Sequence, residues 1–313
     1  MNVVIMSLAG PSLSWLRRHC PQQRMSFSSA LRVAFYCMNA IEDLHCIGFI
    51  HRDIKASNFA LGYYASECRR IRMLDFGFAR CYLSNDKNGI LHHRRPRKRA
   101  PFLGTDRYCS PNVHRRIEQG RRDDCWSWLF MLVELMYGKL PWRELTGRKI
   151  LKCKEDSLTT LFKHGPIEMY QALDHIQDLR YESRPDYEFF RSLIIKICQT
   201  RGIVLSEPFD WEKGGCAYEA FCDSGEITTF TSREKSQEVA KSKSKISESP
   251  KAEAFEKPAT PKNHIAPKEV VAELKEEDTQ IDDSPRKKKE HEESIKEDKT
   301  QEDSVQDTTE KHK

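Results

Sequence analysis

The residues with the clearest capacity for chemistry stand in two segments, His51-Arg52-Asp53-Ile54-Lys55-Ala56-Ser57-Asn58 and Asp75-Phe76-Gly77. Transfer of a phosphoryl group depends on positioning and charge neutralisation more than on covalent help. Asp53 could orient an acceptor hydroxyl and take up its proton, while Lys55 could sit beside the transferring phosphate. Asn58 and Asp75 offer the oxygen ligands that hold Mg²⁺ across phosphates. These four side chains therefore predict a site for phosphoryl transfer.

The order of these segments is more informative than either segment alone. Asn58 follows Asp53 by five positions, Asp75 comes after a short hairpin pattern, and Gly104-Thr105 lies beyond it. The protein-kinase signature has the same pieces in the same order, so we expect a protein-kinase fold. A plain turn residue before Gly77 is the alternative for Asp75, and the neighbouring motif weighs against it. Lys55 favours serine or threonine over tyrosine as the acceptor.

The elements that must position these residues follow from the spacing of apolar side chains. A helical stripe runs from Ser28 to His45 and ends before Gly48. Asp123 or Asp124 could cap a buried helix over 126–137. The fold class is α+β, a mostly helical body with a short hairpin. We further expect strands at 2–6, 59–61 and 71–74, a long loop over 75–112, and helices at 155–164, 167–180 and 186–198.

Composition divides the chain into a globular part and a charged tail. Between Arg233 and Lys313 there are 18 Lys and Arg against 21 Asp and Glu, a net of −3, so the total of +5 leaves +8 for residues 1–232. A segment this poor in apolar groups cannot offset the entropy of ordering its backbone. We expect a kinase domain over 1–213, an extension over 214–232 and a disordered tail over 233–313.

Cysteine usage and apolar runs indicate an intracellular protein. The 11 cysteines are irregularly spaced without any C-x-x-C pair, which favours reduced thiols over disulfides or a zinc site. The first nine residues could pass for a short secretory signal, but no Lys or Arg precedes the apolar run. No run approaches the ~20 apolar residues of a membrane span. We expect a cytoplasmic location, with the nucleus as a second compartment.

Several motifs together resemble the casein kinase 1 superfamily, and within it the tau-tubulin kinase group with its nematode members. The resemblance spans about residues 2–213. It implies a two-lobed kinase fold, ATP with Mg²⁺ and protein serine or threonine acceptors, with cytoskeletal proteins as a candidate class. Its motifs are Leu8-Ala9-Gly10-Pro11-Ser12-Leu13, Gly48-Phe49-Ile50-His51-Arg52-Asp53-Ile54-Lys55, Met73-Leu74-Asp75-Phe76-Gly77-Phe78-Ala79-Arg80, Gly104-Thr105-Asp106-Arg107-Tyr108, Arg121-Arg122-Asp123-Asp124, Leu140-Pro141-Trp142-Arg143 and Pro208-Phe209-Asp210-Trp211-Glu212-Lys213.

The resemblance also implies roles for single residues. Met6 falls at the gatekeeper position, and Ser7, Leu8 and Ala9 at the hinge whose backbone meets adenine. Thr105 should bridge Asp53 and Lys55 in the substrate loop. Asp124 should hold the catalytic loop from the buried helix, although a plain helix cap is its alternative role. The structural members of the motifs are His51, Arg52, Phe76, Gly77 and Asp124.

Two departures from the family pattern stand out. Ser110-Pro111-Asn112 replaces the usual A-P-E, and Pro111 is the unusual residue, since the superfamily reads Ser-Ile-Asn there. The sequence also begins in the strand before the hinge, without a preceding Gly-rich loop or strand lysine. We therefore expect a partial kinase domain, either from a truncated gene model or isoform, or because the chain works without catalysis. The rival function is a non-catalytic half-kinase that binds proteins.

A basic run inside the expected loop, 92–99, leaves three interpretations open. It could be a solvated charged segment, or a patch for nuclear import or nucleic-acid binding. It could also be an anion site for acidic or pre-phosphorylated protein substrates, aided by Arg107, Arg148, Lys149 and Lys152. Nucleic acid is the least expected partner, because no aromatic platform accompanies the run. In the tail, Ser249-Pro250, Thr260-Pro261 and Ser284-Pro285 are candidate phosphorylation sites or ordinary linker.

Overall fold

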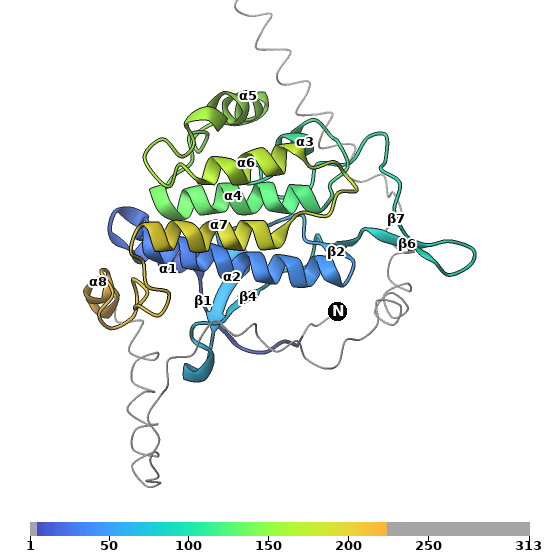
Figure 1. Ribbon diagram of the computed structural model, residues 1–313. Helices are drawn as coiled ribbons and strands as arrows, with labels where there is room; N and C mark the ends of the chain where they lie inside the picture. The colour runs from blue at the N-terminus through green and yellow to red at the C-terminus, as the bar shows by residue number, and fades with distance from the viewer. Residues whose placement is uncertain (1–4, 224–313) are drawn as a thin grey trace, which may run out of the picture. The chain divides into compact units, whose positions relative to one another are not determined.

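The computed structural model describes residues 5–223 (Figure 1). Its α-helices are α1 Leu13–His19, α2 Phe27–Cys46, α3 Pro111–His114, α4 Arg121–Tyr137, α5 Arg148–Ser157, α6 Met169–Asp178, α7 Tyr187–Thr200 and α8 Tyr218–Asp223. Its strands are β1 Ala9–Ser12, β2 Phe49–Ile50, β3 Phe59–Gly62, β4 Ile71–Met73, β5 Arg80–Cys81, β6 Leu83–Asn85 and β7 Leu91–His93. Short 3₁₀ turns are η1 Pro21–Gln23, η2 Ala56–Asn58, η3 Ala65–Glu67 and η4 Leu158–Thr160. The predicted tail over 233–313 and residues 2–4 of the predicted first strand lie outside this range.

The core is a helical body in which α2, α4, α6 and α7 lie side by side (Figure 1). Nearly every side chain of α4 is buried, so this helix is covered on all faces, as expected for a helix at the centre of a domain. Trp128 of α4 is fully buried, donates its indole N–H to Ala34 O at 3.0 Å and packs on Phe190 at 5.4 Å between ring centroids. One aromatic side chain thus ties α2, α4 and α7 together.

Several predicted elements are confirmed with small shifts in their bounds. The predicted helix 28–45 is α2, whose N-cap Ser26 accepts a hydrogen bond from the Ser29 N–H, and which ends before Gly48 at φ +92°. The predicted helices 167–180 and 186–198 are α6 and α7. The buried helix begins earlier than predicted, at Arg121, because the Asp123 side chain accepts the Gly120 N–H and so caps its first turn.

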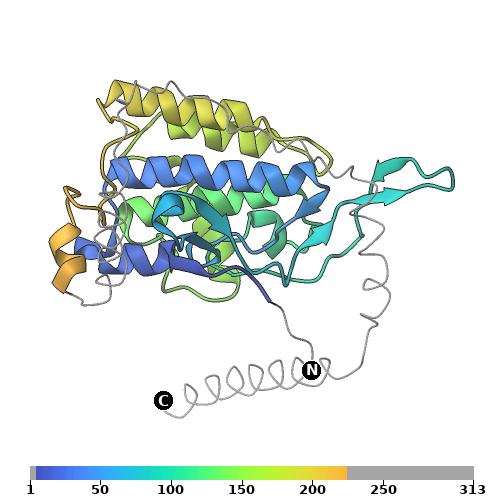
Figure 2. The same ribbon diagram turned by 90° about the horizontal axis from the view of Figure 1, so that it is seen from below.

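Three predictions are wrong in physical detail. Ile5 and Met6 are 94% and 63% exposed and form no strand; the first described strand is β1. The helix predicted at 155–164 is instead α5, which begins after Gly147 at φ +57° and gives way to η4. The expected loop over 75–112 contains strands: β5 pairs with β2, and β6 with β7 in a projecting hairpin (Figure 2).

A three-stranded antiparallel sheet in the order β1-β3-β4 positions the two motifs singled out in the sequence, 51–58 and 75–77. Phe59 pairs with Met73 and Ala60 with Arg72, and the Leu74 N–H donates to Asn58 O at 2.8 Å. The β3–β4 hairpin therefore brings the residue before β3 and the residues after β4 to the same end of the sheet.

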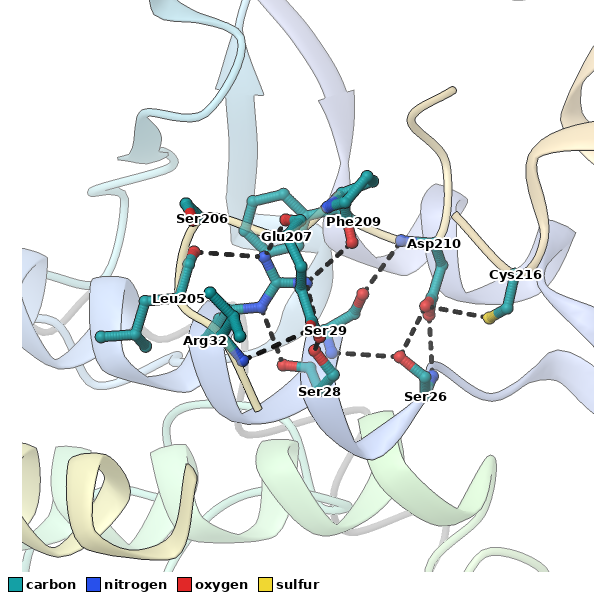
Figure 3. A network of polar contacts seen from close by, with 12 residues as sticks. Ser26, Ser28, Ser29, Arg32, Leu205, Ser206, Glu207, Phe209, Asp210 and Cys216 are labelled. Carbon is teal, nitrogen blue, oxygen red and sulfur yellow. Dashed lines mark hydrogen bonds and ion pairs between the residues drawn. The ribbon is translucent and has the colours of Figure 1, made fainter. Parts of the chain in front are cut away.

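The segment that follows α7 packs back onto the start of α2 (Figure 3). Arg32, 1% exposed, donates to Leu205 O at 3.4 Å, Glu207 O at 2.6 Å and Pro208 O at 3.0 Å, and its guanidinium lies 4.1 Å from the Phe209 ring centroid. The Asp210 carboxylate accepts from the Ser26 N–H at 2.7 Å and hydroxyl at 2.6 Å. In the segment 214–223, Phe221 is fully buried and packs on Trp15 at 5.9 Å.

Across residues 5–223, no helix combines the length and the apolar character that crossing a membrane requires.

Candidate active site

Asp53 is the centre of the site, and both of its carboxylate oxygens are engaged. Oδ1 accepts from the Thr105 hydroxyl at 2.7 Å, and Oδ2 accepts from Lys55 Nζ at 2.5 Å. Lys55 Nζ also lies 3.4 Å from the Thr105 hydroxyl, so lysine, threonine and aspartate form a closed triangle. The Asn58 amide donates to Asp53 O at 2.9 Å, which ties the end of the loop to its centre. The predicted bridge by Thr105 is therefore present.

Gly104 explains how the threonine reaches the carboxylate. It has φ +108°, a value that side-chain-bearing residues rarely adopt. A Cβ at this position would stand 2.5 Å from Arg52 O, closer than any real Cβ contact. Only glycine lets the chain before Thr105 pass this close to the loop 51–58.

Asp124 fixes the catalytic loop from the core. Its Oδ2 accepts from the His51 N–H at 2.7 Å and from His45 Nε2 at 2.9 Å, and its Oδ1 accepts from the Arg52 N–H at 2.9 Å. Burial opposes the charged form, but the His45 and His51 contacts outweigh it, so the pKa of Asp124 lies below its ordinary value. Asp123 does the capping, so the two neighbouring carboxylates divide the two roles considered for Asp124.

Asp75 lies at the end of the hairpin that carries Asn58. The neighbouring Leu74 is bonded through its N–H to Asn58 O at 2.8 Å and through its C=O to His51 Nε2 at 3.1 Å. Phe76 packs on the His51 ring at 5.5 Å between centroids. Asp75 itself has φ +60°, is exposed, and accepts from the Gly77 N–H at 3.3 Å. The sequence motifs 51–58 and 75–77 thus meet in one place.

Asn58 and Asp75 carry amide and carboxylate oxygens, which are ligands of the kind that Mg²⁺ takes. The Asn58 amide nitrogen is used by Asp53, which leaves its oxygen as the atom free to act as a ligand. Among the described residues, no group of three or more His, Cys, Asp or Glu side chains could hold a metal on its own. That finding is compatible with Mg²⁺ in phosphate-transfer sites, where one or two protein ligands act together with substrate phosphates and water.

Beside the catalytic loop, three arginines gather around one carboxylate. Arg97 forms a bidentate ion pair with Glu118, donating from Nε to Oε2 at 2.5 Å and from Nη2 to Oε1 at 2.7 Å. Burial, together with repulsion from Arg80 and Arg97, lowers the pKa of Arg52 to about 10. Burial opposes ionisation of Glu118, but the Arg97 bonds outweigh it and its pKa lies below the ordinary value. Part of the basic run is therefore ordered by internal ion pairs rather than simply solvated.

Of the residues predicted to form an anion site, one is bonded to a buried carboxylate and three are exposed to solvent. Arg107 contacts the buried Glu134 at 3.3 Å, where the Tyr108 hydroxyl also donates at 2.5 Å. Arg148, Lys149 and Lys152 lie exposed on α5. The guanidinium of Arg107 thus has an internal partner, while Arg148, Lys149 and Lys152 face solvent.

The predicted hinge residues stand at the start of the described chain. Met6 and Leu8 are 63% and 60% exposed, Ser7 lies between them, and Ala9 opens β1 opposite Gly62. The pairing of β1 with β3 brings this segment to the strand that begins directly after Asn58.

Sequence reasoning missed functional contacts that depend on tertiary packing. His45 was visible only as a member of the inward stripe of α2, yet it contacts Asp124. Ser110-Pro111 carried a local signal, since serine and proline suit the N-cap and first turn of a helix. In the structure Ser110 caps α3, and its hydroxyl also donates to Asp123 at 2.5 Å. The buried Lys154 gave no sequence signal at all.

Comparison with known proteins gives consistent matches. A model of the protein kinase domain matches residues 5–203. A Dictyostelium discoideum protein named as a probable serine/threonine-protein kinase is 36% identical over 213 residues, 67% of this chain and 42% of that protein. The serine/threonine-protein kinase spe-6 of Caenorhabditis elegans is 35% identical over 217 residues, 66% of this chain and 56% of that protein. The chain thus spans about half the length of these curated relatives.

Proposed function

The chain belongs to the protein kinase family, and on this premise we propose that it acts as a serine/threonine protein kinase, transferring the γ-phosphate of ATP to protein hydroxyls. The observation that carries the proposal is the Asp53 carboxylate, held on one oxygen by Thr105 and on the other by Lys55. We place the protein in the casein kinase 1 superfamily, near the tau-tubulin kinases. The motifs 104–108 and 208–213 support this finer placement.

In the proposed reaction Asp53 orients the acceptor hydroxyl and takes up its proton. Lys55 keeps its ammonium beside the transferred group, and the Thr105 hydroxyl fixes the plane of the carboxylate. Because positioning dominates phosphoryl transfer, a rigid base within one loop is an effective arrangement. Asn58 and Asp75 would hold Mg²⁺. When bound, the metal supplies the positive charge that the phosphate oxygens require. Ser7, Leu8 and Ala9 would contact the adenine, with Met6 beside it.

The acceptor class follows from charge. Arg95, Lys98 and Arg99 are exposed near the catalytic loop, and Arg148, Lys149 and Lys152 are exposed on α5. Exposed cations favour acidic or phosphorylated protein segments, because carboxylates and phosphates form charge-assisted bonds with them. We propose such segments, cytoskeletal proteins included, as substrates. A cytoplasmic location is part of the same proposal.

The decisive experiment measures transfer of labelled phosphate from ATP by purified full-length protein. Serine, threonine and tyrosine peptides, each with acidic and with neutral flanks, serve as acceptors. Asp53→Asn should lower kcat roughly a hundredfold or more, because the general base is lost. Asp174→Asn, an exposed aspartate on α6, is the matched control. Equal rates for wild type and Asp53→Asn would remove Asp53 from the mechanism.

The rival function predicts a different result in the same assay. A non-catalytic module would retain peptide binding while transfer is undetectable in wild type and Asp53→Asn alike. Peptide affinity measured by fluorescence anisotropy beside the transfer assay separates the two functions.

A further inference from the structure

Lys154 is a fully buried lysine on α5, at 0% exposure. Its Nζ donates to two backbone carbonyls, Asp106 O and Cys109 O, each at 2.6 Å. It also lies 3.1 Å from His114 Nε2 and 3.8 Å from the Cys109 sulfur. The rings of Phe130 and Trp142 surround the ammonium, with centroids at 5.3 and 5.5 Å. No other lysine of the described chain is as fully buried.

The two carbonyls belong to the loop that delivers Thr105 to the catalytic base. Thr105 O accepts from the Tyr108 N–H at 2.9 Å and from the Cys109 N–H at 3.0 Å, so residues 105–109 form one compact turn. Lys154 binds this turn at Asp106 and at Cys109, on either side of its middle. The turn has further contacts: the Trp142 indole N–H donates to Arg107 O at 2.8 Å, and the side chains of Arg107 and Tyr108 contact Glu134. At its start, the Thr105 hydroxyl donates to Asp53.

We propose that Lys154 is a positioning residue. Its ammonium holds the turn 105–109 so that the Thr105 hydroxyl stays hydrogen-bonded to Asp53. The link to phosphate transfer rests on the proposed function, whereas the anchoring of the turn does not.

The energetics of the site favour this role over simple packing. A buried ammonium without a carboxylate partner is costly to desolvate, and two short hydrogen bonds to the carbonyls of the turn are what offsets this cost. Burial accordingly lowers the pKa of Lys154 to about 8, and burial with the nearby Lys154 charge lowers that of His114 to about 4. A buried charge whose bonds go to one turn of the chain is expected where the position of that turn matters.

The first test asks whether Lys154 holds the turn, and it needs neither ATP nor an acceptor. In full-length Lys154→Met, hydrogen exchange at the Tyr108 and Cys109 amides should accelerate about tenfold or more, since local opening controls exchange. Alkylation of the Cys109 thiol, now 4% exposed, should accelerate with it. Cys125, fully buried in α4, reports global unfolding and should react no faster than in wild type.

The matched control is Lys163→Met, an identical change at an exposed lysine. Unchanged exchange in Lys154→Met, or equal acceleration at Cys109 and Cys125, would overturn the inference. If Lys154→Met does not fold, Lys154→Gln takes its place, because it keeps an N–H donor without the charge. The same selective acceleration at Cys109 is then expected, and its absence would also overturn the inference.

The second test asks whether the anchored turn serves the reaction. Where wild-type protein transfers phosphate, Lys154→Met should lower kcat between about tenfold and a hundredfold, because misplacement of catalytic groups by about 1 Å has costs of this size. The KM for ATP should stay unchanged, since Lys154 touches none of the proposed nucleotide residues. A freed turn with unchanged kcat would remove the link to catalysis, and an inactive wild type would count against the proposed function alone.

Discussion

Asp53 is fixed by two donors that approach different oxygens, Thr105 on Oδ1 and Lys55 on Oδ2. The two donors have separate roles, because only the lysine carries a charge that attracts a phosphate. The threonine hydroxyl orients the carboxylate that we propose as the base. The two contributions can therefore be separated by changing Thr105 alone.

Thr105→Val replaces the hydroxyl by a methyl group of the same shape. A hydrogen bond to a charged group is worth about 1.5–3 kcal/mol, so kcat should fall roughly tenfold to a hundredfold. Steady-state kinetics measures the effect, and Thr105→Ser, which keeps the hydroxyl, should stay within about threefold of wild type. Similar rates for the valine and serine variants would mean that the 2.7 Å contact has no catalytic consequence.

Asp124 is a buried carboxylate with three donors, from His45, His51 and Arg52. Asp124→Asn removes the charge and turns an amide N–H toward groups that themselves donate. Because an unmatched buried polar contact is costly, the free energy of unfolding should fall by about 3 kcal/mol. Urea denaturation measures it, and the exposed Asp174→Asn should change stability by less than about 0.5 kcal/mol.

At the scale of elements, the segment 205–213 joins two parts of the chain that are distant in sequence. It receives the buried Arg32 from α2 and the half-exposed Arg69 from the turn of the β3–β4 hairpin, which is bonded to Glu212 at 2.5 and 2.9 Å. The end of the hairpin opposite the active site is therefore tied to the helical body.

The two arginines should differ strongly when each is replaced. Arg32→Met removes a buried guanidinium that donates to three partly buried carbonyls, and should lower the free energy of unfolding by about 2–4 kcal/mol. Arg69→Met removes an exposed ion pair and should cost less than about 1 kcal/mol. Urea denaturation of both variants provides the comparison, and equal losses would show that burial does not govern this clamp.

The sequence predicted those elements whose signal is local. The stripe of α2 and the hairpin of β3 and β4 follow from spacing alone, and the motifs located Asp53, Asn58 and Asp75. The helix at 155–164 was misplaced because Leu158, Leu161 and Phe162 continue a helical spacing through a 3₁₀ turn. Contacts such as Lys154 with Asp106 O could not be predicted, since they depend on how separate elements pack.

For the whole molecule, pH should act through His114. Burial and the nearby Lys154 hold the pKa of His114 at about 4, below its ordinary 6.5. The side chain also lies near Cys109, Asp106, Arg116 and the Phe102 ring. Between pH 4 and 6.5, His114 is therefore protonated in the unfolded chain but largely neutral in the folded protein. The free energy of unfolding should therefore decline as pH falls from 6.5 toward 4.

Denaturation at several pH values tests this expectation. His114→Gln should flatten the dependence across that window, whereas the exposed His164→Gln should leave it as in wild type. An unaltered slope in His114→Gln would assign the acid sensitivity to other groups.

Two residues of the catalytic motifs, Arg52 and Asp75, have φ values of +67° and +60°. Outside glycine, such left-handed backbone costs about 1 kcal/mol or more at each position. Glycine at either place would relieve that strain and stabilise the fold. At position 75 it would also remove the side chain that we propose as a Mg²⁺ ligand. Selection for folding stability and selection for turnover therefore act in opposite directions at these positions. Variants that gain stability there should be among the least active ones.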